Sequence, residues 1–328
     1  MEFTISRNTF LKSLSHAYGI IEKKTTLPIL SNILIEAKDS KIRITATDLD
    51  IIYTEEIPLQ ELKKEGSTTT SASIIYDILR KLEPNTKVEL FLQSANKLKL
   101  VSGNSKFNLL CLSPDNFPLS DEDIKQKTFE VSSKKMLKLL NKTKISISND
   151  ETRHYLNGIY LHKINIENKS FLSSVATDSH RLSSSRLEID SNTDFESIIL
   201  PKKTIFQLIS LLEQSTSAIK ISNNKSKIKF EIDSGVLISK VIDGRFPDYS
   251  KVVPIDNVKI LQIKLNEFKN SIERVTTVSS DRKEGLKMNI SKDFLQLSVN
   301  SPNSGEGIES INAIFNSDDM DISFNSRY

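Results

Sequence analysis

The chain has 328 residues, 38% hydrophobic and 27% charged, which fits a globular protein of two or three domains and excludes wholesale disorder. Its net charge of +3 gives no global signature of a nucleic-acid-binding protein, so the local pattern of charge decides. No apolar run approaches the roughly 18 residues that cross a bilayer, and the N-terminus lacks a cationic start followed by an apolar core. We therefore expect a cytoplasmic protein without membrane contact. The single cysteine, Cys111, lies in an apolar run and is predicted to be a core residue.

An alternating strand, a turn and a helix start open the chain, and the same pattern recurs twice. The three segments run from Phe3 to Leu14, from Phe129 to Leu140 and from Leu261 to Ile272. Phe10, Met136 and Phe268 occupy equivalent places in them, spaced by 126 and 132 residues. This spacing predicts an internal repeat much longer than that of a solenoid.

A second helical segment also repeats, from Ala72 to Glu83 and from Lys202 to Glu213, at an offset of 130 residues. Both segments place apolar residues at i, i+3, i+4 and i+7, which marks one buried helix face. These residues are Ile75, Ile78, Leu79 and Leu82, and Ile205, Leu208, Ile209 and Leu212. The sequence ATDLD at Ala46 and the sequence ATDSH at Ala176 share the same offset, which makes chance an unconvincing explanation.

Between the helices, alternating apolar and polar runs predict half-buried antiparallel strands. The runs are Lys41 to Thr45, Val88 to Leu92, Lys97 to Val101, Phe107 to Leu112, Phe171 to Val175, Ala218 to Ile221, Lys227 to Ile232 and Val236 to Ile242. We therefore predict an α+β protein in which each unit packs two helices on antiparallel sheet. Linkers are expected from Leu119 to Lys127 and from Asp248 to Lys259.

The third unit is expected to be incomplete. Its first helix and its strands are present, and the chain ends in a run, Ile322 to Tyr328, that aligns with the strand before a unit's second helix. About 38 residues of a full unit would then be absent, by alignment with the segment from Thr204 to Ile242.

Positive charge is concentrated on the predicted helices. The first helix of unit one carries Arg7, Lys12 and His16 and no acid, and that of unit two carries five lysines and no acid. Acidic residues such as Asp115 and Glu188 lie in connectors and turns. Basic helices without interleaved aromatic residues suit phosphates rather than bases, so binding should be independent of nucleotide sequence and sensitive to salt. The residues expected to face DNA are Arg7, Lys12, Arg80, Lys134, Lys135, Lys138, Lys142, Lys202, Lys203 and Lys269.

Five segments resemble, in order and spacing, signatures of the bacterial DNA sliding clamps, the β subunits of the replicative DNA polymerase III. They are TLPIL at Thr26, ATDLD at Ala46, RHYLNGIYL at Arg153, ATDSHRL at Ala176 and DGRFPDY at Asp243. The resemblance runs from Met1 to Tyr328 and implies three clamp domains, at 1–120, 128–253 and 258–328, the last incomplete. It also implies a head-to-tail homodimeric ring that encircles double-stranded DNA, with its helices lining the hole.

The same resemblance implies a non-catalytic subunit, without cofactor or metal, that holds the polymerase III alpha subunit, the clamp loader and other partners through a peptide pocket. The matching pocket residues are Leu156, Thr177, Ser179, His180, Arg181, Leu182, Pro247, Lys251, Val252 and Val253. Ser179 departs from a glycine, and Lys251 from an arginine, that are common in the family. Ring closure would place an edge strand of domain one against domain three of the partner chain. The matching residues are Lys106, Phe107, Asn108 and Leu109, and Thr277 and Val278.

Two alternatives stay open. Asp178, His180 and Ser183 superficially suggest a catalytic triad, but triad members normally come from separate elements, and the chain has no phosphate-binding glycine loop. The second alternative is a truncated clamp paralogue that binds peptides without encircling DNA. A closing clamp should dimerise, which would separate it from such a module.

Overall fold

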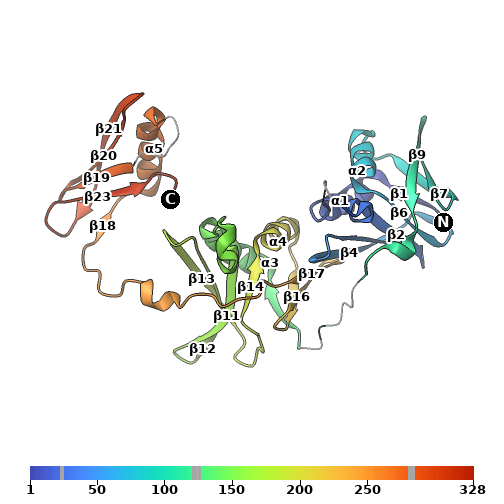
Figure 1. The fold of residues 1–328 in the computed structure, drawn as a ribbon, viewed down its shortest axis with the longest axis horizontal. Coiled ribbons are helices and arrows are strands. Elements are labelled where there is room, and N and C mark those ends of the chain that lie inside the picture. The colour runs from blue at the N-terminus through green and yellow to red at the C-terminus, as the bar shows by residue number, and fades with distance from the viewer. Residues whose placement is uncertain (23–25, 120–123, 125–126, 280–284) are drawn as a thin grey trace. The chain divides into compact units, whose positions relative to one another are not determined.

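The computed structural model describes residues 1–22, 26–119, 124, 127–279 and 285–328, which form two compact units, Met1–Phe246 and Pro247–Tyr328 (Figure 1). The first unit contains the first two sequence repeats and the second unit contains the third. Most of the predicted linker from Leu119 to Lys127 lies outside the described residues. Within the described ranges, no helix has the length and apolar character needed to span a bilayer.

The predicted helices and strands are present in all three repeats, and their bounds are as follows. The first repeat contains β1 (Glu2–Ser6), α1 (Arg7–Tyr18), β2 (Asn32–Lys38), β3 (Lys41–Thr47), β4 (Ile51–Pro58), β5 (Glu61–Lys64), β6 (Gly66–Ser71), α2 (Ala72–Lys81), β7 (Lys87–Ser94), β8 (Lys97–Ser102) and β9 (Ser105–Leu112). The second contains β10 (Phe129–Ser132), α3 (Ser133–Thr143), β11 (Gly158–Ile166), β12 (Lys169–Thr177), β13 (Leu182–Ile189), β14 (Ile198–Pro201), α4 (Lys202–Gln214), β15 (Ala218–Asn223), β16 (Lys227–Ile232) and β17 (Gly235–Lys240). The third contains β18 (Leu261–Gln262), α5 (Leu265–Val275), β19 (Gly285–Ile290), β20 (Phe294–Ser301), β21 (Gly305–Asn312), β22 (Ile314–Phe315) and β23 (Met320–Asn325).

Short 3-10 helices occupy several connections. They are η1 (Pro28–Ser31), η2 (Pro114–Asn116), η3 (Lys144–Ser146), η4 (Glu151–Leu156), η5 (Tyr249–Val252) and η6 (Thr276–Val278). Helix α2 ends at Lys81, earlier than the predicted helical segment, because Leu82 is already extended and Pro84 disfavours helical backbone at the residue before it.

The sheets confirm the repeat. Each repeat has an antiparallel row of four strands in the same order, namely β4-β3-β2-β6, β13-β12-β11-β14 and β21-β20-β19-β23. Strand β23 pairs with β19 as β14 pairs with β11, so the run from Ile322 near the chain's end forms the predicted strand. The remaining strands form a second row in the first two repeats, β9-β8-β7-β1-β5 and β17-β16-β15-β10.

Equivalent apolar positions form the core. Phe10 and Met136 are fully buried, and Phe268 packs against the smaller core of the third repeat. The helix faces predicted from i, i+3, i+4 spacing are buried as well, with Leu79 of α2 and Leu208 of α4 at 0% exposure. Each such side chain contributes about 1.5–3 kcal/mol by leaving water, so these faces fix the helices on the sheets.

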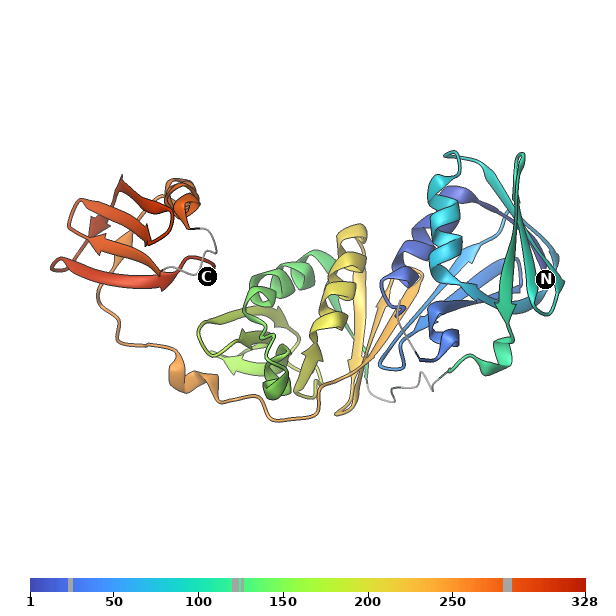
Figure 2. The same cartoon turned by 45° about the horizontal axis from the view of Figure 1, so that its top comes forward.

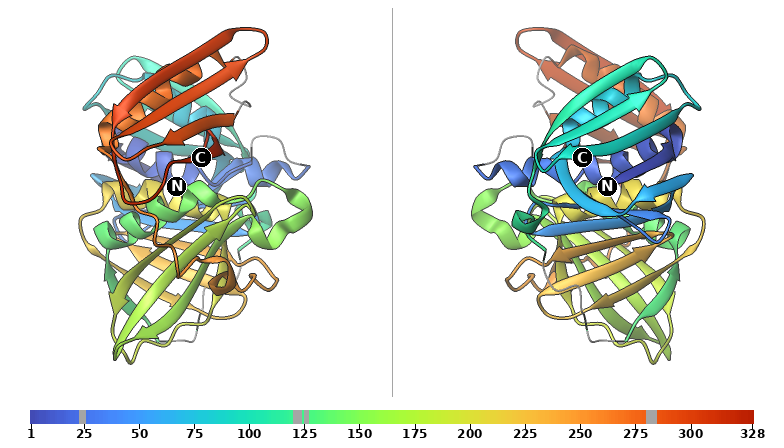
Figure 3. Two further views of the ribbon diagram at one scale, coloured as in Figure 1. Left: turned by 90° about the vertical axis from the view of Figure 1, so that its left-hand side faces the viewer. Right: turned by 90° about the vertical axis from the view of Figure 1, so that its right-hand side faces the viewer.

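The first two repeats share one continuous sheet. Strand β17 of the second repeat pairs antiparallel with β4 of the first, with Leu237 opposite Tyr53 (Figure 3, right, where the blue β4 lies beside the orange β17). The amide of Lys240 donates to the carbonyl of Asp50 over 2.8 Å beyond the end of this ladder. On the helical side, α2 contacts α1, α1 contacts α4 and α4 contacts α3, which makes a row of four helices (Figure 2).

A buried polar cluster lies beneath this junction. His16 of α1 places Nδ1 at 3.2 Å from Glu55 Oε2 and Nε2 at 3.1 Å from Gln214 Oε1, and the Tyr53 hydroxyl lies 3.2 Å from Nδ1. His16 is only 7% exposed, so it adds nothing to the exposed positive charge of α1. It turns inward because a carboxylate from β4 and an amide from α4 satisfy both ring nitrogens.

Two pKa shifts report the packing of this cluster. Burial of Glu55 raises its pKa, but the hydrogen bond from His16, together with nearby hydroxyl groups, outweighs that effect and lowers the pKa overall. Burial, and then the charge of Glu55, raise the pKa of Tyr53 well above its ordinary value. Glu55 is therefore an anion held by donors from both helix and sheet.

Candidate functional site

The ATDSHRL segment folds into a tightly bonded turn between β12 and β13. Thr177 Oγ1 donates to the carbonyl of Arg181 over 2.7 Å and accepts from the amide of Ser179 over 3.1 Å. Asp178 Oδ1 accepts from the amides of His180 and Arg181, each over 3.0 Å. The Thr-Asp pair thus supplies the acceptors that close the turn, as short polar side chains do in such loops.

The ATDLD segment of the first repeat forms the same turn 130 residues earlier. Thr47 Oγ1 donates to the carbonyl of Ile51 over 2.9 Å and accepts from the amide of Leu49 over 3.0 Å. Asp48 Oδ1 accepts from the amides of Asp50 and Ile51 at 3.0 and 2.7 Å. The short match between ATDLD and ATDSH therefore corresponds to the same pattern of hydrogen bonds in both repeats.

Asp178 is also held by charge. Burial raises its pKa, but the amides of His180 and Arg181 and the Arg181 guanidinium, whose Nε donates to Asp178 Oδ2 over 3.0 Å, lower the pKa overall. The carboxylate consequently fixes the Arg181 side chain, one of the predicted pocket residues, against the turn.

The third residue of each turn has a left-handed backbone, with φ of 78° at Leu49 and 75° at Ser179. Glycine adopts this conformation without steric cost, which gives a physical reason for the glycine that the family resemblance expects in place of Ser179. Ser179 compensates in part, since its hydroxyl accepts from Arg153 Nη1 over 2.5 Å, while Arg153 Nε donates to Asp150 over 2.8 Å.

The other predicted pocket residues of the first unit differ in exposure. His180 is exposed at the tip of the turn, and Leu182 is half-buried at the start of β13. Leu156, at the end of η4, is only 2% exposed and belongs to the core of this unit. Of the predicted pocket residues in the first unit, those of the turn are thus exposed or half-buried, whereas Leu156 is a core residue.

The remaining pocket candidates belong to the second unit, at and near η5. Asp248 Oδ1 accepts from both the amide and the hydroxyl of Ser250, over 3.3 and 2.6 Å, and Oδ2 lies 3.5 Å from Lys251 Nζ. The Ser250 hydroxyl is the main cause of the lowered pKa of Asp248. Val252 and Val253 are 68% and 43% exposed, so this segment presents apolar side chains to solvent just after Pro247.

The basic face is best developed on α3. Lys134, Lys135, Lys138 and Lys142, with Lys12 of α1, are exposed, and within the described ranges none of them has an acidic partner. Their charge is consequently not neutralised within the unit, and helices α1 and α3 both belong to the row of four (Figure 2).

Other predicted DNA-facing residues have partners. Arg7 Nε donates to the carbonyl of Leu79 over 2.7 Å and Nη2 to that of Arg80 over 3.0 Å, so Arg7 caps the C-terminus of α2. Arg80 Nη2 lies 3.2 Å from Asp77, and in the second unit Lys269 lies 3.9 Å from Glu273. These side chains have less freedom to reach a phosphate than the lysines of α3.

Of the two lysines that begin α4, one binds within its own repeat and the other binds the first repeat. Lys202 Nζ donates to Asn149 Oδ1. Lys203 Nζ donates to the carbonyl of Ile20 over 2.8 Å and forms an ion pair with Asp48, whose side chain is only 6% exposed. Lys203 therefore joins the ATDLD turn of the first repeat to the second repeat. Sequence reasoning missed this role, although the repeated Thr-Asp motif offered a signal for it.

The predicted closure strand, β9, is a partly open edge. Lys106 to Leu109 pair with β8, whereas β6 pairs only with Cys111 and Leu112 further along. Phe107 is half-buried and Leu109 is 7% exposed. Cys111 is buried as predicted, and burial raises the pKa of its thiol.

The triad alternative does not match the hydrogen bonds. The Asp178 carboxylate accepts from backbone amides and Arg181, and the Ser183 hydroxyl lies 2.6 Å from that of Ser146. In the described ranges there is also no group of three or more His, Cys, Asp or Glu side chains suited to a metal ion.

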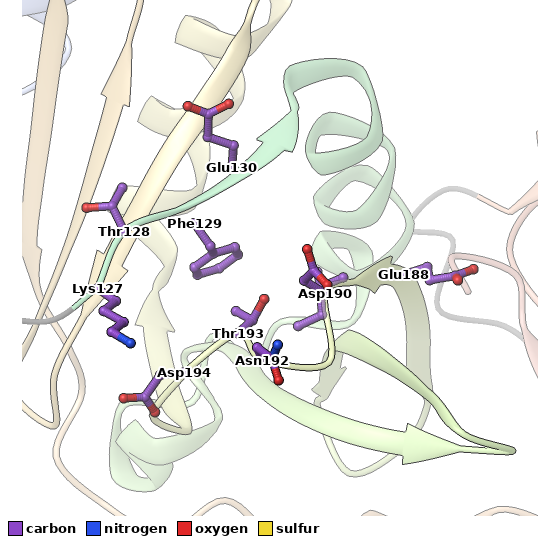
Figure 4. Close-up of a pocket in the computed structure, with 10 residues that line it drawn as sticks. Lys127, Thr128, Phe129, Glu130, Glu188, Asp190, Asn192, Thr193 and Asp194 are labelled. Carbon is purple, nitrogen blue, oxygen red and sulfur yellow. The ribbon is translucent and has the colours of Figure 1, made fainter.

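One hollow of about 660 Å³ lies between the start of β10 and the connection after β13, away from every predicted site residue (Figure 4). Its rim carries Glu130, Glu188 and Asp194, and Phe129 packs edge-to-face on Phe195 with the ring centroids 5.9 Å apart. Its acidic rim makes it unsuited to phosphate.

Comparison with known proteins agrees with this geometry. Models of the N-terminal, central and C-terminal domains of the DNA polymerase III beta subunit match residues 1–121, 130–248 and 250–328. The beta sliding clamps of Caulobacter vibrioides and Escherichia coli are 34% and 29% identical over 330 and 328 residues, covering 100% of this chain and 88% of each relative. The crystal structure of a Bartonella birtlesii sliding clamp bound to griselimycin has 37% identity and a TM-score of 0.96, over 100% of this chain and 88% of that one. The chain therefore belongs to the DNA polymerase III beta subunit family, the bacterial beta sliding clamps.

Proposed function

We propose that this chain is a processivity factor of DNA replication, which encircles duplex DNA without sequence specificity and tethers the replicative polymerase to it. The observation that carries the proposal is the set of exposed lysines without acidic partners on α1 and α3. Lysine side chains bind phosphates as point charges and read no base edges, so the surface can slide along any sequence. Topology rather than affinity then retains the ring.

The junction between the first two repeats shows how two clamp domains can join, and it supports a specific mode of ring closure. There, β17 closes onto β4, and by repeat equivalence β9 corresponds to β17 and β21 corresponds to β4. Among the described residues β21 pairs only with β20, so both edges have room for a further strand. We propose that β9 of one chain pairs with β21 of a second copy, which makes a head-to-tail homodimer.

The residues named for this interface fit that arrangement. Helix η6, which contains Thr277 and Val278, packs against β21, and β9 contains Lys106 to Leu109. An apolar hollow of about 390 Å³ lies beside Phe107, lined also by Ile74 and Ile78 of α2. Ile74 is 53% exposed, which an interface would cover.

Partner binding is the second part of the proposal. We propose that the Thr177–Leu182 turn and Leu156, together with Pro247, Lys251, Val252 and Val253, receive short apolar motifs of the polymerase alpha subunit, the clamp loader and other proteins. The exposed valines of the second unit can supply apolar contact, and the hydrogen-bonded turn of the first unit can supply polar groups held in a fixed geometry. The griselimycin-bound relative supports a ligand-binding surface in this family.

The proposed role is architectural, without a chemical step of its own, and would be exercised in the cytoplasm where the chromosome is replicated. The alternative, a peptide-binding module that does not encircle DNA, is not favoured because the family models match all three domains.

Two measurements test the proposal. Light scattering over a concentration series should give twice the chain mass of 37.1 kDa, and a clean monomer at high concentration would exclude the closed ring. With its clamp loader and ATP, the protein should be retained on nicked circular plasmid and lost when the plasmid is linearised.

Charge reversal then tests the inner face. Replacing Lys134, Lys138 and Lys202 by glutamate should weaken DNA binding and lower the slope of log K against log salt by roughly 2.7, at about 0.9 per lost phosphate contact. Reversal of Lys41, Lys169 and Lys220 is the matched control, since these exposed lysines lie on strands β3, β12 and β15. Equal losses in both triples would mean that net charge, and not the helical face, binds DNA.

A further inference from the structure

An exposed phenylalanine lies in the row of helices. Helix α4 buries Ile205, Leu208 and Leu212, and its exposed stripe contains Lys203, Phe206, Ser210 and Glu213, spaced by three and four positions. Phe206 is 46% exposed, although an aromatic ring of this size normally gains several kcal/mol from burial. The apolar spacing of the helix places Phe206 off its buried face, so this position is not one that the core requires.

The aromatic ring of Phe206 borders a hollow of about 570 Å³ at the junction of the first two repeats. The hollow is lined by Gly19, Lys202, Lys203, Phe206 and Gln207. This volume lies within the roughly 300–1,000 Å³ of small-ligand sites. Gln207 is 7% exposed and donates through Nε2 to the carbonyl of His16 over 2.7 Å, so one wall is rigid. Gly19 keeps it open, because a Cβ there would lie 2.2 Å from Gln207 Oε1.

Three lysine side chains lie near the aromatic ring of Phe206. Lys144 Nζ lies 5.8 Å from the Phe206 ring centroid, which is within cation–π range. Lys202 and Lys203 precede Phe206 by four and three residues and line the hollow with it, while their ammonium groups donate to Asn149 and Asp48. The site thus combines an open aromatic face with positive charge.

We propose that Phe206 is a stacking platform for an unpaired base of DNA, with Lys144 and Lys202 contacting the adjoining phosphates. The proposal rests on the clamp function above and specifies one class of ligand for its inner face. Paired bases expose only their edges, so an aromatic face gains stacking energy only from a base that has left the duplex. A cationic groove with an aromatic platform is the arrangement that binds single strands without sequence preference. The clamp would accordingly prefer DNA that carries a single-stranded segment.

The test uses the whole chain and two fluorescein-labelled probes, a 20-nucleotide oligothymidine and a 20-base-pair blunt duplex, titrated by anisotropy at several salt concentrations. Phe206→Ala should weaken binding of the single strand about tenfold, as loss of one stacked base does, and change duplex binding less than twofold. Because no charge is removed, the salt slope should stay constant, whereas Lys202→Ala should lower the single-strand slope by about 0.7. Phe206→Tyr keeps an aromatic face and should restore binding. Ser210→Ala, one turn further along the same stripe, is the matched control.

Three outcomes would overturn the inference. They are unchanged single-strand binding by Phe206→Ala, equal losses on both probes, and a loss confined to binding of a partner protein. If the unmodified chain does not bind the single-stranded probe, the stacking platform is rejected as well, whereas the proposed DNA function is decided separately by retention on the nicked circular plasmid, because a closed ring is held by topology. A normal Lys202 response with a silent Phe206→Ala rejects only the stacking platform.

Discussion

Replacing Glu55 by glutamine tests whether the buried cluster at the junction of the first two repeats holds them together. The Glu55 and His16 side chains are 10% and 7% exposed, and His16 also reaches Gln214 of the second repeat. The change keeps the volume of the side chain but removes its charge and turns one acceptor into a donor. Since His16 and the Ser234 hydroxyl both direct hydrogen bonds at this carboxylate, the new amide would meet a donor.

The magnitude follows from burial. Hydrogen bonds to a charged group contribute about 1.5–3 kcal/mol, and glutamine retains one acceptor oxygen, so we expect a loss of about 2 kcal/mol in the free energy of unfolding. The adjacent Glu56 is the control. It is 41% exposed and pairs with Arg43 over 2.7 Å, so Glu56→Gln should cost no more than about 0.5 kcal/mol after solvent screening.

Urea unfolding followed by circular dichroism gives the free energies, and hydrogen–deuterium exchange locates the effect. Glu55→Gln should speed exchange in β4 and β17, which meet at the junction, and leave β20 of the other unit unchanged. The lowered pKa of Glu55 means that its contribution exists at neutral pH and is lost as the pH falls below the ordinary value of 4.5. Equal destabilisation by the two substitutions, or a uniform rise in exchange, would refute the reasoning.

Two further predictions concern single side chains. Burial lowers the pKa of His162 from 6.5 to about 4, so His162 is protonated in the unfolded chain at a higher pH than in the folded protein. The free energy of unfolding should therefore fall as the pH drops from 6.5 to 4, by about 2–3 kcal/mol near pH 4.5. The His162→Gln variant should lack this fall, and a variant with the same dependence of stability on pH as the unmodified chain would contradict the prediction. Ser179→Gly should raise the free energy of unfolding by about 0.5–1 kcal/mol because φ there is 75°, whereas Ser183→Gly, within strand β13, should lower it; thermal unfolding of both variants compares them, and a destabilised Ser179→Gly would show that the Arg153 bond outweighs the strain.

The amino-acid sequence was enough to predict the threefold repeat, the helices, part of the strands, the buried Cys111 and the family, whereas strands such as β2, β4, β11 and β13 were not among the predicted runs. The predicted features depend on periodicity and on residues close together in the chain. The Thr-Asp turns are an example, since each is closed by hydrogen bonds spanning two to four residues, from Thr47 to Ile51 and from Thr177 to Arg181. Such hydrogen bonds can be predicted from the sequence, because the Thr and Asp side chains bond to backbone groups only a few residues away.

Which charged and aromatic side chains face solvent depends on the folded arrangement and could not be predicted from the sequence. Arg7 and His16 belong to the same basic helix as Lys12, yet Arg7 caps α2 and His16 turns into the junction. Lys203 has a partner 155 residues away in Asp48, and Phe206 stays exposed beside buried neighbours. A charge bound to a distant partner has the same sequence pattern as a free one, because the free energy of desolvation depends on what the fold places beside it.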